Sequence, residues 1–432
     1  MIFFLRWHRE YLTRVELTLR QIDTSIGIPY IDWTLDDALD HPRDSILFSE
    51  YLMGDTSGKR DNENGSWVIN GPFKDFATAH GNPRLTRWVG EPIEDPVTKE
   101  MVEPRPMTQE NVDYLLNAEN VDQIITFSMF KDEKGCKYSD QIKKAQGMDP
   151  ENAHGRGHVF VGGDMGEFST ASNDPIFYMH HAFVDFLWEE WRKTKQDPSQ
   201  WETGWITDSE ACSAPQHFKR ILMYPFIPML NEDGLSINYT KNMYKYEPRP
   251  ICNRENIDCK SEFLFCDLTK GKKGPRCASK IKKGKPCDGY EHNEDVCYLG
   301  ECIDGICVEN DSILPNTPPP EPTVVRETAK QAPAQQLRHR SYATTHLGTG
   351  ATTSIPAVNT GARSANAKGT QYGCRATAKF HVVFAIPTII TITAKAITTL
   401  LAPVGLGRKL SIKLSIQLRY VSTFPNVPSR VG

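Results

Sequence analysis

The amino-acid sequence predicts a mainly α-helical protein with long loops, followed by a disulfide-rich module and a disordered tail. Three observations predict this order. Two long segments in the first half carry apolar residues at helical spacing. Eight of the eleven cysteines then fall between Cys252 and Cys307. The remaining residues are rich in Pro, Thr, Ser, Ala and Gly and contain few residues able to form a core.

The first helix is predicted near the N-terminus, where apolar residues follow one another at intervals of three and four. This helix face consists of Leu5, His8, Leu12, Val15, Leu19 and Ile22. His8 is its one polar member. Single buried histidines are more often hydrogen-bonded in a core than bound to a metal, so this segment alone favours a structural role. The Gly27-Ile28-Pro29 stretch ends the helix.

A second helix is predicted over residues 174–194, after long loops with short helices at 36–135. Asn173 or Asp174 can cap it, and Pro175 suits the first helical position, where no amide hydrogen is needed. Apolar residues lie nearly all round this helix, so we expect it to be central and buried. The adjacent His180 and His181 each need a polar partner in such surroundings.

The cysteine-rich module predicts an oxidising compartment. An even number of cysteines in a short stretch rich in Gly, Lys and Asp is typical of a disulfide framework. A zinc module is the competing interpretation, but zinc sites usually contain CxxC-type pairs and none occurs in this sequence. The connectivity stays open. Sequons at Asn64, Asn238 and Asn310 fit a secreted glycoprotein.

The tail differs from the body in charge. From residue 323 onward there are 14 Lys and Arg residues and one acid, Glu327, which leaves 36 basic and 53 acidic residues, a net charge of about −17, before it. The acidic body does not indicate a nucleic-acid partner. An apolar stretch at 382–405 is long enough for a membrane anchor, but Lys395 near its middle costs roughly 2.5–3.5 kcal/mol. A β-prone tail and a sequence absent from the mature protein are the alternatives.

These features divide the chain into residues 1–250, a cysteine-rich module at 251–310 and a basic tail at 311–432. Within the first part, His154 and His158 stand four residues apart, on one side of the helix if the segment is helical. Gly155 and Gly157 weaken any helix at this point, so a surface turn and a metal site both stay open. With His8 and the pair at 180–181, three segments that we expect in the core carry histidine.

Together these segments resemble the tyrosinase family of type 3 copper proteins, especially its invertebrate secreted forms. The matching stretches cover roughly the first 210 residues and are FLRWHREYL (4–12), IPYIDWTLD (28–36), NGPF (70–73), HGRGHVFVGGDM (154–165) and NDPIFYMHHAFVDFLWEEW (173–191). The resemblance implies a type 3 copper helical bundle with two copper ions, each bound by three imidazoles. It also implies oxidation of mono- and o-diphenols to o-quinones with O₂ as the co-substrate.

Carried over by motif, the resemblance assigns His154, His158 and His181 to the second copper ion. His181 rather than its neighbour follows the family pattern, in which the second histidine of the pair binds the metal. His8 matches the third ligand of the first copper ion. A helix that directs an imidazole into the core is then explained, because the core contains metal.

The resemblance also implies roles around the metal. Asp185 matches a carboxylate that orients a histidine of the first site, and Phe177 matches an aromatic ring that packs against the ligands. Gly155, Val159 and His180 are candidates for the substrate pocket. The family often has Asn where Gly155 stands, which favours diphenol oxidation over monophenol hydroxylation for this chain.

One part of the pattern is missing. The family supplies the other two ligands of the first copper ion from residues before His8, and none of the seven residues there is histidine. We therefore expect one copper ion or none, little activity, and an N-terminally incomplete sequence, which also accounts for the absent signal peptide. The alternative is a non-catalytic secreted matrix or binding protein. A hemocyanin-type oxygen carrier is less favoured, and nothing indicates the oligomeric state.

Overall fold

The structure is a computed structural model that describes residues 2–62, 65–94, 99–124, 135–140, 145, 147–204 and 208–310, and the backbone of strands at 375–383, 388–397 and 413–422. Its α-helices are α1 (Ile2–Arg20), α2 (Trp33–Asp37), α3 (Gln109–Asn117), α5 (Pro150–Val161) and α6 (Ile176–Lys195). Its short helical turns are η1 (Pro42–Asp44), η2 (Ile46–Phe48), η3 (Val121–Gln123), η4 (Gly163–Gly166), η5 (Ala171–Asn173), η6 (Pro198–Gln200), η7 (Pro215–His217), η8 (Asn231–Leu235) and η9 (Tyr239–Met243).

The strands that precede the tail are short. They are β1 (Ser66–Trp67), β2 (Thr86–Arg87), β3 (Ile93–Glu94), β4 (Met101–Val102), β5 (Leu264–Asp267), β6 (Arg276–Ser279), β7 (Gly300–Ile303) and β8 (Ile306–Glu309). They pair only as two-stranded ribbons, β1 with β2, β3 with β4, β5 with β6 and β7 with β8. The prediction of a mainly α-helical fold with long loops is therefore confirmed.

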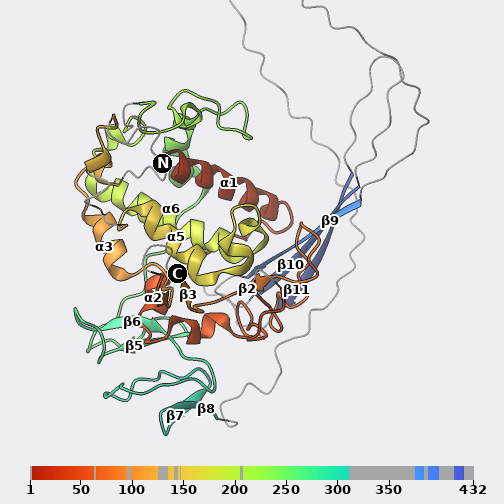
Figure 1. Cartoon of the computed structure of the whole chain (residues 1–432), viewed down its shortest axis with the longest axis vertical. Helices are drawn as coiled ribbons and strands as arrows, with labels where there is room; N and C mark the ends of the chain where they lie inside the picture. Colours follow the sequence, from red (N-terminus) through yellow and green to blue (C-terminus); the bar gives the residue numbers. More distant parts are fainter. Residues whose placement is uncertain are drawn as a thin grey trace, which may run out of the picture.

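Helix α6 forms the centre of the helical part. Its residues are buried from Ile176 to Glu189 without a break, because apolar side chains surround the helix on every side. Helices α1, α3 and α5 all pack against it (Figure 1). On α1 the predicted face is buried at Leu5, Leu12 and Leu19, and the helix ends at Arg20. The three histidine-bearing segments thus meet at one helix.

The contact between α1 and α6 also contains buried charges, which the apolar pattern did not predict. Arg9 on α1 donates from Nε to Asp185 Oδ1 at 2.7 Å and also pairs with Glu189. Arg192 donates to the same Glu189 at 2.6 Å. All four side chains are at most 4% exposed. Charges removed from water in this way persist only when paired, so they fix how α1 lies on α6.

The start of α6 is held by Asp174. Its Oδ1 accepts from the Ile176 backbone N–H at 3.0 Å, and its carboxylate forms a fully buried ion pair with Arg87. Of the two predicted caps, Asp174 therefore bonds to the first turn, whereas the Asn173 amide donates to Asp164. Pro175 stands one position earlier than predicted, at the cap rather than in the first turn.

Residues 150–161 form a helix despite their glycines. The Asp149 side chain accepts from the Asn152 N–H at 3.1 Å, and Pro150 occupies the first turn, so the start of α5 is well specified. His154 and His158 therefore share one face of α5. The segment is a helix and not a surface turn.

The cysteine-rich module is a disulfide framework, as predicted. Its pairs are Cys252–Cys266, Cys259–Cys277, Cys287–Cys302 and Cys297–Cys307, and a fifth disulfide, Cys136–Cys212, lies in the helical part. The strands β5–β6 and β7–β8 form two antiparallel hairpins that these disulfides link to the neighbouring loops. Two groups of three module cysteines lie close together. All of these cysteines are in disulfide bonds, so their closeness does not indicate a zinc site.

The module packs against the helical part rather than standing apart from it. Strand β6 lies on α2, at the lower edge of the helices in Figure 1. Ser279 Oγ donates to Asp36 Oδ1 at 2.8 Å, and the Ile46 N–H donates to the Lys280 carbonyl at 2.8 Å. A shared apolar cluster, which includes Leu39 and the module residues Phe265, Ala278 and Ile281, lies beneath these bonds.

Part of the tail is described as a three-stranded antiparallel sheet. Its strands β9 (Arg375–Val383), β10 (Thr388–Ile397) and β11 (Lys413–Ser422) pair in the order β11-β10-β9. The backbone of these residues is β-strand, and the rest of 311–432, like Asn64, lies outside the described residues. Among the described helices, none combines the length and the apolar character that crossing a membrane requires.

Candidate metal centre

Three histidines from two packed helices form the centre. His154 and His158 lie one turn apart on α5, and His181 projects from α6. One ring nitrogen of each lies within 4.8 Å of the others, and the Nε2 atoms of His158 and His181 are 3.3 Å apart. The structure thus brings together the three residues that the sequence assigned to one metal ion.

Backbone carbonyls orient the two rings on α5. Nδ1 of His154 donates to the Glu151 carbonyl at 3.1 Å, and Nδ1 of His158 donates to the Met165 carbonyl at 2.8 Å. With its proton on Nδ1, each neutral ring has its lone pair on Nε2. Nε2 of His154 is buried and has no hydrogen-bond partner among the described residues. A buried acceptor without a partner is unfavourable unless a cation binds it, so these residues fit a metal ion.

The electrostatic environment keeps these rings neutral. Burial lowers the pKa of His154 and of His181 well below the usual value, and the surrounding imidazoles lower both further. Burial also lowers the pKa of His158, although its bond to Met165 opposes this. A neutral imidazole is the form that binds a metal ion. At neutral pH the three rings therefore have lone pairs available, and imidazole nitrogen suits copper, zinc, iron or nickel.

His8 lies directly against this group but is not one of its members. Its ring stacks on His181 with a centroid distance of 3.9 Å and an angle of 2° between the planes. Nδ1 donates to the Phe4 carbonyl at 2.9 Å, and burial lowers the pKa of His8 to about 3. Within the described residues, no group of three ligands includes His8. Its assignment to a first copper ion stays a prediction.

Two phenylalanines enclose the imidazoles. The Phe177 ring, predicted to pack against the ligands, lies 4.3 Å from the His181 ring and 5.8 Å from that of His8. The Phe4 ring, to which no motif assigned a role, lies 4.4 Å from His154 and 4.5 Å from His8. Its position one turn before His8 was the available signal, because residues four apart on a helix are neighbours.

Asp185 has partners other than the predicted one. Its Oδ1 accepts from Arg9, and its Oδ2 accepts from the hydroxyls of Tyr244 and Tyr246, each at 2.6 Å. None of these bonds in the described structure involves an imidazole. Asp185 therefore bonds to Arg9, the neighbour of His8 on α1, and its predicted role in orienting a histidine of the first site stays a prediction.

The three pocket candidates differ in accessibility. Val159 is 45% exposed, and a Cβ at Gly155 would meet no atom within 4 Å, so both border open space beside the α5 histidines. His180 is 0% exposed, and its Nδ1 accepts from Trp33 Nε1 at 2.7 Å. His180 thus differs from the other two candidates in being buried and hydrogen-bonded, and its place in the substrate pocket stays a prediction.

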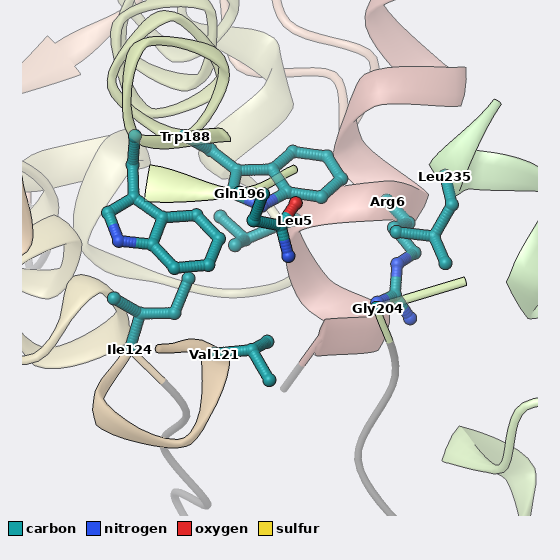
Figure 2. Close-up of a pocket in the computed structure, with 9 residues that line it drawn as sticks. Leu5, Arg6, Val121, Ile124, Trp188, Gln196, Gly204 and Leu235 are labelled. Carbon is teal, nitrogen blue, oxygen red and sulfur yellow. The ribbon is translucent and has the colours of Figure 1, made fainter. Parts of the chain in front are cut away.

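A separate pocket lies on another side of α1. Its lining includes Leu5 and Arg6 of α1, Trp188 of α6 and Leu235 of η8 (Figure 2). None of the histidines contributes to this lining. The pocket is therefore distinct from the metal centre.

The chain matches one protein family and is similar to several known proteins. The family profile described as the common central domain of tyrosinase matches residues 1–194. The chain is 40% identical over 317 residues to a putative tyrosinase-like protein, tyr-3, of Caenorhabditis elegans, covering 73% of this chain and 41% of the relative. It is 30% identical over 206 residues to a tyrosinase of Streptomyces galbus, and the match covers 48% of this chain and 67% of the relative.

A molluscan protein is also similar. Tyrosinase-like protein 1 of Margaritifera margaritifera is 29% identical over 268 residues, covering 61% of this chain and 47% of the relative. The chain thus spans less than half the length of the nematode and molluscan relatives.

Proposed function

Because this chain belongs to the tyrosinase family, we propose that His154, His158 and His181 together bind one copper ion. The observation that carries the proposal is the buried Nε2 of His154, which lacks a hydrogen-bond partner in the described structure and lies with the other two rings. Three neutral imidazoles match the nitrogen ligands that copper accepts in both oxidation states. Copper is chosen over other metals because the family uses it.

We further propose that the reaction is oxidation of phenols, with o-diphenols favoured, to o-quinones by O₂. When bound, copper supplies the redox chemistry. The chain orients the imidazoles through the carbonyls of Glu151 and Met165, and Phe177 excludes water from one side of them. The open space at Gly155 and the exposed Val159 leave a side from which a phenol can approach.

We expect this chain to hold a single copper ion and to oxidise diphenols slowly, because within the described residues no group of three ligands includes His8. A specific observation favours a second candidate function, that of a non-catalytic binding or matrix protein. The disulfide module packs on α2 through Ser279 and Asp36, and its disulfides cross-link the loops beside its hairpins. Five disulfides support secretion for either function, since they persist in oxidising compartments.

The test is the copper content of the purified full chain after reconstitution with copper and gel filtration, measured by atomic mass spectrometry. We expect about one copper ion per chain, lost in His154→Ala and retained in the control His41→Ala, whose side chain is 46% exposed. No copper in the unsubstituted chain would refute the proposal. Two copper ions would show that further ligands complete a first site.

An oxygen-consumption assay with catechol on the same samples separates the two functions. Slow oxidation that disappears in His154→Ala supports the impaired oxidase. Copper binding without any oxidation favours the binding or matrix function. Rapid oxidation, comparable to that of a bacterial tyrosinase assayed beside it, would contradict the expected impairment.

A further inference from the structure

His180 is buried next to the metal centre, yet its hydrogen bonding prevents it from binding a metal. The indole nitrogen of Trp33 can only donate, so Nδ1 of His180 accepts this 2.7 Å bond. The neutral ring then carries its proton on Nε2. Neither nitrogen offers a free lone pair. This chemistry explains why His181, and not the adjacent His180, joins the group of three.

The ring of His180 instead lies against the two histidines of α5. It stacks on His154 with a centroid distance of 5.1 Å and an angle of 16° between the planes. It meets His158 edge-on at 5.0 Å and 86°. On another side, Phe4 contacts the His154 ring at 4.4 Å. The His154 ring is therefore held between two other rings. Its hydrogen bond from Nδ1 to the Glu151 carbonyl still allows the imidazole to rotate about that bond, so the neighbouring rings must limit this rotation.

Glycine at position 157 makes this arrangement possible. A Cβ there would lie 2.6 Å from Cε1 and 2.9 Å from Nδ1 of His180, closer than real side-chain contacts. The ring therefore occupies the space that a side chain on α5 would fill. Gly155, two residues earlier in the same helix, has no such neighbour, since a Cβ there meets nothing within 4 Å. The two glycines thus provide a matched pair.

We propose that His180 is a positioning residue for the metal site: Trp33 holds it by the indole hydrogen bond, Gly157 makes room for it, and its ring keeps His154 in the orientation that metal binding needs. Trp33 and His180 are both 0% exposed, so water does not compete for their hydrogen bond. This inference rests on the proposed copper site. Its test distinguishes failure of the copper site from failure of the positioning role.

The experiment uses the full chain with Trp33→Phe, which removes the N–H donor and keeps an aromatic ring, and with Gly157→Ala, which displaces the His180 ring. Gly155→Ala is the control, because it makes the same change in helix propensity without the contact. Copper(II) affinity is measured by competition with a chelator, and the copper(II) EPR spectrum reports the geometry of the bound imidazoles. Circular dichroism of the metal-free proteins verifies folding.

We expect Trp33→Phe and Gly157→Ala to weaken copper(II) binding by about 10–100-fold, as the loss of residues that orient ligands does elsewhere. Their EPR spectra should change, and the Gly155→Ala protein should match the unsubstituted one. If the unsubstituted chain binds no copper, the proposed function fails. If it binds copper and both variants equal it in affinity and spectrum, the positioning role alone is overturned.

Two further outcomes are decisive. If Trp33→Phe does not fold, the comparison of Gly157→Ala with Gly155→Ala decides the question by itself, since both carry the same chemical change in α5. If Gly155→Ala weakens copper binding as much as Gly157→Ala, the effect comes from the helix and not from His180. That result would overturn the proposal.

Discussion

Asp36 lies where α2 meets the disulfide module, and we predict that Asp36→Asn removes a large pH dependence of stability. Its carboxylate is 2% exposed. Oδ1 accepts from Ser45 Oγ at 2.6 Å and from Ser279 Oγ at 2.8 Å. Burial raises the pKa of Asp36 to about 7, although the two serine hydrogen bonds lower it in part.

The sign and size follow from proton linkage. Between the unfolded pKa of 3.8 and the folded pKa of about 7, the folded protein keeps a proton that the unfolded chain has released. The contribution of Asp36 is therefore fully present below pH 3.8, falls as pH rises through this window and is lost above pH 7. Roughly three pH units at about 1.4 kcal/mol each amount to about 4 kcal/mol.

The assay is urea unfolding with the disulfides intact, followed by tryptophan fluorescence at several values between about pH 4 and pH 8. Other groups also titrate, so the quantity of interest is the difference between Asp36→Asn and the unsubstituted protein at each pH. That difference should shift by about 4 kcal/mol in favour of the variant between about pH 4 and pH 8. Asp40→Asn is the control, because the Asp40 side chain is 68% exposed. Parallel profiles for the Asp36→Asn and unsubstituted proteins would refute the reasoning.

Two further predictions concern the stability of the framework that holds the site. Asp185→Ala should lower the free energy of unfolding by about 3–5 kcal/mol, because it leaves the buried Arg9 with one carboxylate fewer. Glu190→Ala, at an exposed pair on the same helix, should change it by less than about 1 kcal/mol, and equal effects in denaturant titrations would contradict this account. Replacing Cys259 and Cys277 by Ala, which opens a disulfide spanning 18 residues, should cost about 3 kcal/mol in the same assay, and an unchanged midpoint would show that packing on α2 suffices.

Local patterns in the sequence were enough to predict α1 and α6, two of the three helices that carry the histidines. The apolar face of α1 and the all-round apolar character of α6 depend on residues three and four apart, which lie together in any helix. The helix at His154 and His158 was left open, because Gly155 and Gly157 weaken a helix, and the structure decided it. The eight cysteines of the module likewise predicted a disulfide framework, since their even number and the lack of CxxC pairs favour disulfides over zinc.

Other features could not be derived locally. Disulfide connectivity has many combinatorial solutions, and only the fold selects one. The choice between His180 and His181 came from family resemblance, because periodicity cannot distinguish two neighbours on a helix buried on every side. The buried Arg9, Asp185 and Glu189 interrupt an otherwise apolar contact, and no hydrophobic pattern indicates where charges will find partners.

The sequence by itself determined the mainly α-helical class and the disulfide module, and its resemblance to a known family identified three candidate metal-binding histidines. The tertiary structure decided what each neighbouring group does. Trp33 and His180 stand 147 residues apart, and their hydrogen bond exists only because the fold brings the first residue of α2 beside α6. That contact determines which nitrogen carries the proton, and hence which histidine has a lone pair for a metal. Local spacing indicates which residues are candidate ligands, whereas long-range packing decides how their rings are oriented.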